Sequence, residues 1–219
     1  MLIVLQNLKI NNMSIQLYKP NSKNTGAAFT FSIGSNKNNS LPAFYINAIS
    51  QFSWDADKKI GTFSGNSKNP DKKVNVKLSE LECGEFISAI KNRHEYSAFH
   101  AYENNSTSIK FSPWEKDVKV SKYDPSSKSY KDSKVKVPAF GLTISKGKGS
   151  SFKIGIDPGE VEVLLKLLEA YLQDFIKEKI MIQKRMTSNQ KSNSEKNFES
   201  PDSVNSESVE EDEFEDVPF

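Results

Sequence analysis

The stretch KVNVKLSELE, residues 73–82, contains a complete strand-to-helix junction within ten residues. Its valines and first leucine alternate with polar residues, which is the pattern of a strand with one buried face. Ser79 follows, with Glu82 three positions later, and this pair forms the capping box that begins an α-helix. The stretch therefore predicts a β-strand that leads directly into a helix.

A second junction of the same kind occupies residues 151–160, SFKIGIDPGE. Here Asp157 is the expected N-cap, Pro158 suits the first helical position, and Glu160 repeats the glutamate of the first junction. The two capping positions are separated by 78 residues, from Ser79 to Asp157. This repetition predicts an internal duplication of a strand-rich unit that ends in a helix.

The segments before both junctions predict β-structure, because short alternating or apolar runs lie between turns rich in Asn, Ser, Gly and Pro. The predicted strands cover residues 27–34, 43–54, 59–65, 74–78, 96–102, 106–111, 117–120, 135–145 and 151–156. We therefore expect an α+β fold made of a duplicated antiparallel β-sheet plus C-terminal helix unit. The repeats are expected at about 1–94 and 95–186, with an insertion near 121–134.

The end of the chain differs from this body in composition. The second helix is expected to end at about residue 182. Residues 187–209 are rich in Ser and Asn and nearly free of core-forming side chains, which predicts a disordered linker. Residues 210–219, EEDEFEDVPF, form an acidic tip that carries six carboxylates. The folded domain is thus expected within 1–186.

Charge is divided between the body and the tail. Residues 1–193 carry 29 Lys and Arg against 18 Asp and Glu, a net charge of +11. Residues 194–219 carry 1 basic and 10 acidic residues, a net charge of −9. A basic body favours a polyanionic partner, and an acidic tail favours a different one.

Few residues suit catalysis or metal binding. Cys83 is the single cysteine and falls in a predicted helix, so we expect a structural thiol and a reducing compartment. The only histidines are His94 and His100, which predicts no zinc site, and no phosphate loop, nucleophile elbow or HExxH motif is present. We expect no enzyme, no cofactor and no membrane partner, and a cytoplasmic location, because signal-peptide and spanning segments are also missing.

The polar side of the predicted sheet carries lysines beside aromatic rings. An exposed ring beside lysines suits base stacking together with phosphate attraction, although any antiparallel sheet with one solvated face shows polar alternation. The candidate contacts to single-stranded DNA are Lys59, Lys73, Lys77, Lys110, Lys119, Lys136, Lys153, Tyr45, Tyr102, Trp54 and Trp114. His100 is expected on the same side, and the two tryptophans suit a core position equally well.

Six phenylalanines and the second helix are expected to supply the core. The phenylalanines are Phe29, Phe31, Phe44, Phe86, Phe111 and Phe152. Helix residues 161–180 are apolar around much of the circumference. This helix therefore either lies deep against the sheet or also packs on another subunit.

Two parts of the sequence resemble known single-strand binders. The tip, Asp212-Glu213-Phe214-Glu215-Asp216-Val217-Pro218-Phe219, resembles the acidic tip of phage and bacterial single-stranded DNA-binding proteins, which commonly ends Asp-Asp-Ile-Pro-Phe. Val217 replaces the isoleucine, and Glu215 replaces the first aspartate. The body, by its order of strands and helices, is similar to the Whirly and transcriptional-coactivator-like fold.

These resemblances imply a sequence-independent single-stranded DNA-binding protein of a bacterial cell or a phage-infected host. Such a protein protects single strands in replication, recombination and repair, forms a homodimer or homotetramer, and recruits partner proteins through residues 212–219. RNA binding or transcription control by a Whirly-like protein is an alternative. A third possibility is a protein-interaction adaptor whose sheet face is merely solvated.

Overall fold

The computed structural model describes residues 13–35, 41–102, 105–147 and 149–196, without the side chains of Tyr102, Asn105 and residues 189–196. The chain divides into two compact units, Met1–Lys179 and Ile180–Phe219. The first unit contains all the strands described below, and the last helix continues from it into the second unit.

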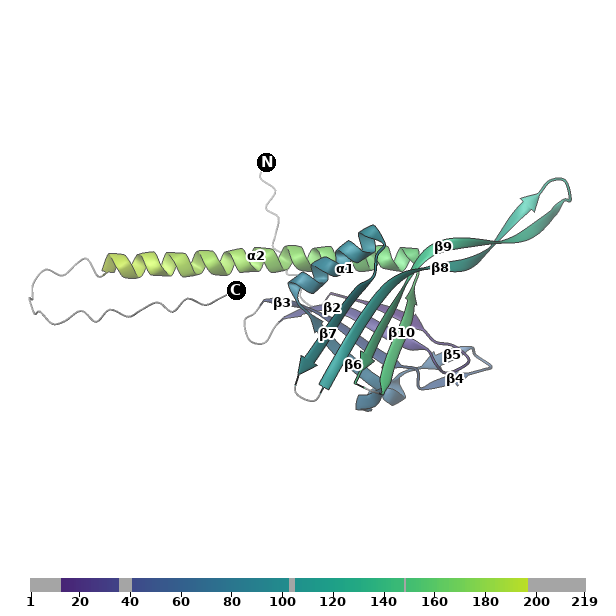
Figure 1. The fold of residues 1–219 in the computed structure, drawn as a ribbon, viewed down its shortest axis with the longest axis horizontal. Helices are drawn as coiled ribbons and strands as arrows, with labels where there is room; N and C mark the ends of the chain where they lie inside the picture. Colours follow the sequence, from purple (N-terminus) through teal and green to yellow (C-terminus); the bar gives the residue numbers. More distant parts are fainter. Residues whose placement is uncertain (1–12, 36–40, 103–104, 148, 197–219) are drawn as a thin grey trace, which may run out of the picture. The chain divides into compact units, whose positions relative to one another are not determined.

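Two four-stranded antiparallel sheets form the first unit (Figure 1). The first sheet has the order β1-β2-β3-β6 and the second has the order β10-β9-β8-β7, so that each strand pairs with the next strand of its own sheet. The first repeat contains β1 (Ser14–Lys19), β2 (Ala27–Ser35), β3 (Pro42–Ser50), β6 (Lys73–Leu78) and α1 (Glu80–Asn92). The second contains β7 (Tyr96–Tyr102), β8 (Asn105–Asp124), β9 (Ser129–Lys146), β10 (Ser150–Ile156) and α2 (Pro158–Lys196). Each repeat is thus a four-stranded meander followed by a helix, which confirms the predicted fold class.

Both predicted junctions begin their helices as expected. At α1, the Ser79 hydroxyl accepts from the Glu82 N–H at 3.3 Å, and Glu82 accepts from the Ser79 N–H at 2.8 Å. At α2, Glu160 likewise accepts from the Asp157 N–H at 2.8 Å. The Asp157 carboxylate instead binds two lysines, Lys19 and Lys116.

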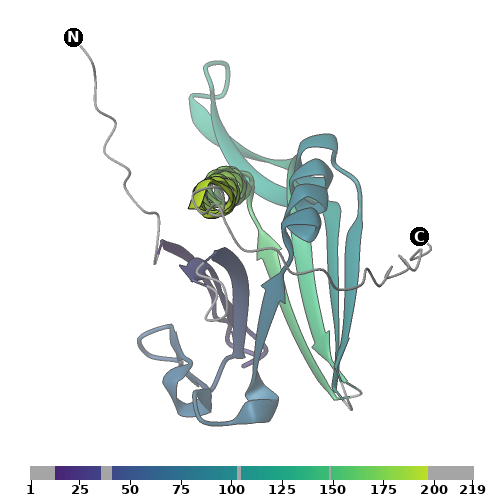
Figure 2. The same cartoon turned by 90° about the vertical axis from the view of Figure 1, so that its left-hand side faces the viewer.

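The two repeats share one core and exchange their helices. On α1, the Phe86 ring lies 4.6 Å from Phe111 of the second sheet, while Tyr171 of α2 lies 5.6 Å from Phe44 of the first. In Figure 2, which views α2 end-on, both helices lie on the inner side of the sheets. The six predicted core phenylalanines are all buried: Phe29, Phe31, Phe44, Phe86, Phe111 and Phe152.

The apolar surface of α2 is mostly explained by this core. Its buried residues are Val161, Leu164, Leu165, Leu167, Leu168, Tyr171 and Phe175. Ile176 and Val163 remain exposed. Of the two expectations for this helix, deep packing against the sheets is therefore the one that the first unit shows.

In the first repeat, three features differ from the sequence prediction. The predicted strand 43–54 is interrupted at Gln51, whose amide is buried and bonds to Asn21, and a short hairpin follows: β4 (Ser53–Asp55) and β5 (Ile60–Thr62). The edge strand β1 was not predicted, because only one of its six residues is buried. Two single-turn 3-10 helices, η1 (Ser64–Asn66) and η2 (Pro70–Lys72), lie before β6.

The second helix continues to Lys196 rather than ending near 182. The first ten residues of the predicted linker are therefore helical. No Pro or Gly occurs between Gly159 and Pro201, so no strong helix breaker stops the helix earlier, although residues 187–194 contain Ser, Asn and Thr, which are weaker helix formers. The rest of the predicted linker and the acidic tip lie outside the described residues.

The predicted insertion near 121–134 is the end of a long hairpin. β8 and β9 remain paired from Thr107↔Lys146 as far as Asp124↔Ser129, well past the edge that β8 shares with β7. We call residues 115–138 the arm. Its two strands cross in Figure 1, as expected for a twisted two-stranded ribbon.

Candidate nucleic-acid interface

Each sheet has one face on the shared core and one face directed away from it. We call these solvent-directed sides the first outer face, on β1, β2, β3 and β6, and the second outer face, on β7 to β10. Their residues follow from strand pairing and alternating burial. The sequence prediction had one continuous lysine face, whereas the structure divides the lysines between two faces and two hairpins.

The first outer face brings together three predicted residues, Tyr45, Lys73 and Lys77. Lys77 pairs with Tyr45 across β6 and β3. The Tyr45 ring lies over Gly34, where an added Cβ would come within 3.2 Å of the ring. The ring therefore reaches across the neighbouring strand on the same face as Lys77, and a ring beside a cation suits base stacking together with phosphate attraction.

A hollow of about 490 Å³ opens on the same face. Lys73 borders it, and the polar residues Thr30, Asn47 and Asn75 line it. Lys146, from the end of β9, borders it as well and donates to the Pro70 carbonyl at 3.3 Å. The prediction did not include Lys146, since only tertiary structure carries it from the second sheet to the first outer face.

The second outer face brings together Trp114, Lys110 and Lys153. A hollow of about 320 Å³ has Trp114 and Lys153 among its lining, together with Gly141 and Gly155. Lys110 and Lys153 both pair with Thr143, so two strand spacings of about 5 Å separate them. Trp114 is 46% exposed, so of the two expected positions, core or surface, it occupies the surface one.

On the outer faces, two exposed aromatic residues escaped prediction. Phe99 of β7 is 69% exposed and pairs with Ser108 on the second outer face. Tyr18 of β1 occupies the corresponding edge strand of the first sheet, where its hydroxyl donates to the Gly61 carbonyl. Each outer face thus has a ring on its edge strand. Local pattern did not identify either ring, because β1 has too few buried residues to be recognised and the inward side of β7 is the more polar one.

The side of β7 on which each residue lies corrects the expectations for His100 and Tyr102. Tyr96 is buried, and His100 bonds to Glu82 of α1 at 2.6 Å, so these residues face the helices. Tyr102 follows His100 by two positions, and alternation assigns it to the same side, while its side chain lies outside the described part. The prediction reversed the faces of this strand because the tyrosines and His100 carry polar groups, whereas the other side holds the fully apolar Phe99.

Four further predicted residues lie away from the outer faces. Trp54 and Lys59 belong to the β4–β5 hairpin, where Lys59 has a φ of 53°. Lys119 and Lys136 lie on the arm, where Lys119 pairs with Lys134 and Lys136 pairs with Asp117. By strand alternation, these two lysines lie on the same side of the ribbon as the buried Phe111 and Phe140, and on the opposite side from Trp114. The prediction joined them to the sheet because it did not anticipate an arm.

An ion-pair cluster joins the repeats where α2 begins. Asp157 lies 2.8 Å from Lys116 of β8 and 3.1 Å from Lys19 of β1. The hydrogen bond from Lys116 is the main reason that the pKa of Asp157 is lowered, and the bond from Lys19 adds to it despite partial burial. Burial would lower the pKa of Lys19, but its contacts with Glu160 and Asp157 raise it overall. The cluster therefore remains charged and links three elements.

A second charged contact supports the start of α1. Burial alone would raise the pKa of Glu82, but hydrogen bonds from His100 and Ser79 outweigh it and lower the pKa. Burial raises the pKa of the nearby Cys83 thiol, as expected for a structural cysteine. No group of three metal-ligating side chains occurs in the described part of the chain. None of the described helices is long and apolar enough to cross a membrane.

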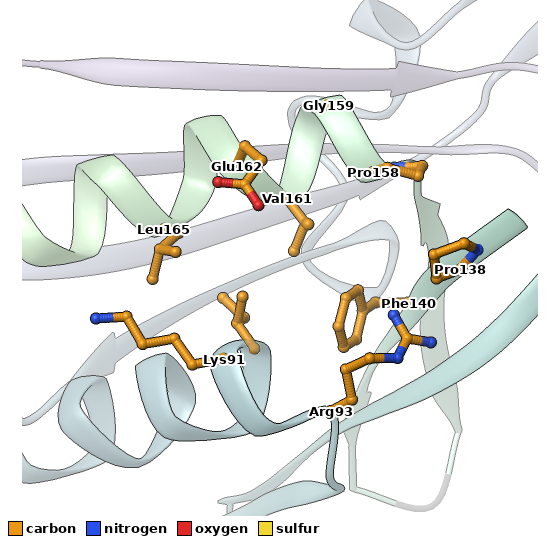
Figure 3. Close-up of a pocket in the computed structure, with 10 residues that line it drawn as sticks. Lys91, Arg93, Pro138, Phe140, Pro158, Gly159, Val161, Glu162 and Leu165 are labelled. Atoms are coloured by element: carbon orange, nitrogen blue, oxygen red, sulfur yellow. The ribbon is translucent and has the colours of Figure 1, made fainter.

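A third hollow lies on the helix side and contains none of the predicted site residues. It measures about 550 Å³ and lies where the end of α1, the base of the arm and the start of α2 meet (Figure 3). The Arg93 guanidinium lies 5.0 Å from the centre of the Phe140 ring, within cation–π range. Ile90, Val161 and Leu165 supply apolar walls, so the hollow is a gap in helix packing rather than a basic groove.

The fold is similar to that of Whirly proteins of plants. The structure of WHY1 from Arabidopsis thaliana matches with a TM-score of 0.50 at 14% identity, over 81% of this chain and 92% of that one. WHY3 from the same plant gives 0.47 at 14% identity, over 81% and 96%. The plant transcriptional regulator PBF-2 gives 0.45 at 14% identity, over 79% and 87%. No family model matches the sequence, and no curated protein matches it. Because the identity is only 14%, the WHY1 match establishes the Whirly-like fold of the body and nothing about its function.

Proposed function

We propose that the protein binds single-stranded DNA without sequence preference, through its two outer faces, and that it is not an enzyme. One observation carries the proposal: outside the arm, the described outward positions of the eight strands hold lysines but no carboxylate, and the nearest one is Glu95, directly before β7, which lies 3.5 Å from Lys110. Those lysines are Lys73, Lys77, Lys110 and Lys153. Lysines attract the phosphate backbone, and the neighbouring Tyr45 and Trp114 rings stack on any base.

A fluorescent dT oligomer, titrated at several salt concentrations, tests this binding. If the four lysines each neutralise one phosphate, the log–log slope of affinity against salt is about −2.8, from about −0.7 per phosphate. Replacing Lys110 and Lys153 by Gln reduces the slope. Replacing Lys166 and Lys177 of α2 removes the same charge from the helix side and leaves it unchanged. No binding, or binding that ignores salt, would contradict the proposal.

RNA is the second candidate ligand, because rings and cations contact bases and phosphates without reading the sugar. Competition among poly(dT), poly(U) and duplex DNA distinguishes the two. Preferential displacement by poly(dT) supports the proposal, whereas preferential displacement by poly(U) replaces it with RNA binding.

For the cell, we propose protection of single strands during replication, recombination and repair, by a homo-oligomer whose residues 212–219 recruit partner proteins. The support is the resemblance of the tip and the contrast between the +11 body and the −9 tail. The same contrast lets the tail compete with DNA for the lysines. Deleting 210–219 is therefore expected to tighten dT binding, chiefly at low salt. Unchanged affinity at low salt would exclude competition and leave recruitment alone.

A further inference from the structure

The arm extends past the sheet without contributing to the hydrophobic core. No residue between Ser112 and Pro138 is buried, although this stretch is described throughout. The paired strands continue for ten residues beyond Trp114, which corresponds to roughly 33 Å of extended chain. Core packing therefore does not explain the length of the arm. Any role of the arm depends on the side chains at its surface.

Lysines oppose one another across the arm. Lys119 pairs directly with Lys134, and Lys122 pairs with Lys131. Like charges at opposed positions destabilise a β-ladder. Lys131 is neutralised by Asp124, but neither Lys119 nor Lys134 has a carboxylate within ion-pair distance in the described part of the chain. These two cations are thus available to an external anion.

Two tyrosines accompany these lysines on the same side of the ribbon. Tyr123 and Tyr130 are directly paired, and their rings meet edge to face at 5.4 Å. They are 54% and 72% exposed, so most of each ring contacts solvent. Positions 119 and 123 alternate to the same side of β8, which places the tyrosine pair and the opposed lysines on one side of the ribbon, with the hydrogen-bonded Ser121–Asp132 pair between them.

We propose that this tyrosine–lysine surface, Lys119, Tyr123, Tyr130 and Lys134, is a second contact for single-stranded nucleic acid. The inference rests on the proposed function, and it adds a site that only long strands reach. Phosphates offset the repulsion between Lys119 and Lys134, and a base stacks on the exposed tyrosines. The arm then extends the length of strand held by each protomer.

Strand length is the variable that tests this site. Two double variants change the arm: one combines Lys119→Gln and Lys134→Gln, and the other combines Tyr123→Ala and Tyr130→Ala. The control for charge is a third double variant on α2, Lys166→Gln and Lys177→Gln. For a dT strand of about 40 nucleotides, each arm variant is expected to bind about ten-fold more weakly. The lysine variant also has a salt slope smaller by about 1.4, since two phosphate contacts are lost. For a strand of about 8 nucleotides, which the outer faces alone accommodate, affinity is unchanged.

A shortened arm gives an independent test. Residues 119–134 are replaced by Asn-Gly, a two-residue turn that joins the paired residues Val118 and Val135. Thermal stability is expected to be unchanged because no buried residue is removed, and the same selective loss of long-strand affinity is expected.

Distinct results separate this proposal from the one on which it rests. If the wild-type protein binds dT with strong salt dependence and the arm variants bind every length equally well, the arm proposal fails alone. It also fails if the variants change the oligomeric state at equal DNA affinity, which would make the arm a contact between copies. Loss of duplex binding without loss of long-strand binding overturns it as well. Absence of any binding by the wild-type protein overturns both proposals.

Discussion

Trp114 has surroundings that suit a base: a half-exposed ring beside Lys153, over strands with Gly141 and Gly155 outward. Replacing it with Ala is expected to weaken dT binding by about ten-fold or more, since stacking contributes about 1–3 kcal/mol per base. Stability is expected to change little. Fluorescence titration and thermal unfolding measure the two effects.

The matched control for this change is Leu81→Ala, which removes another large apolar side chain, 77% exposed, from α1 on the helix side. It is expected to leave dT affinity intact. Equal affinity of Trp114→Ala and the wild-type protein would show that the hollow on the second outer face does not hold a base.

Glu82 combines a helix cap with the His100 contact, and its contribution depends on pH. Glutamine also closes a capping box, so Glu82→Gln removes only the charge, and this is expected to cost about 1 kcal/mol at neutral pH. Because its pKa is lower in the folded chain, the stabilisation is complete above the ordinary glutamate pKa of about 4.3 and is lost as pH falls through the folded value. Urea unfolding over a pH series should show the two proteins converging below about pH 4. A stability difference that stayed constant down to pH 3 would mean that the carboxylate charge contributes nothing.

At the level of elements, the start of α2 is attached to β1 and β8 through Asp157, and Glu160 adds a second ion pair to Lys19. Asp157→Ala removes the contacts with Lys19 and Lys116, and it is expected to lower the free energy of unfolding by about 1–2 kcal/mol, a value limited by solvent screening of half-exposed groups. Asp174→Ala is the control, because it removes the same charge from the same helix, where Asp174 has no ion pair among the described residues. Chemical unfolding measures both. Equal losses would show that the cluster adds nothing beyond its charge.

At the scale of the whole molecule, the exchange of helices makes the repeats interdependent. Phe86 of α1 packs on Phe111 of the second sheet, and Tyr171 of α2 packs on Phe44 of the first. Neither 1–94 nor 95–186 is therefore expected to unfold cooperatively alone, whereas mixing the two is expected to restore a cooperative transition. Circular dichroism during heating measures this. A cooperative transition in 1–94 alone would mean that the first sheet is stable without Tyr171 and its neighbours.

The sequence by itself determined the repeated unit. Alternation before Ser79 and Asp157, together with their glutamates, depends on neighbours within a few residues, so both junctions and the core phenylalanines could be predicted. Local pattern also selected Tyr45, Lys77, Lys110 and Lys153 as outward residues.

Tertiary structure alone decided which of these residues share a surface. Alternation assigns a residue to one side of its strand, but not the strand to a sheet, and packing divided one expected lysine face into two. Where the inward side of a strand carries polar groups and the outward side a phenylalanine, as in β7, only contacts such as that between His100 and Glu82 select the inner side. Pairing at long range likewise carried Lys146 to the first outer face and placed Lys119 and Lys136 on an arm. These outcomes depend on contacts between residues distant in the chain, which local periodicity does not encode.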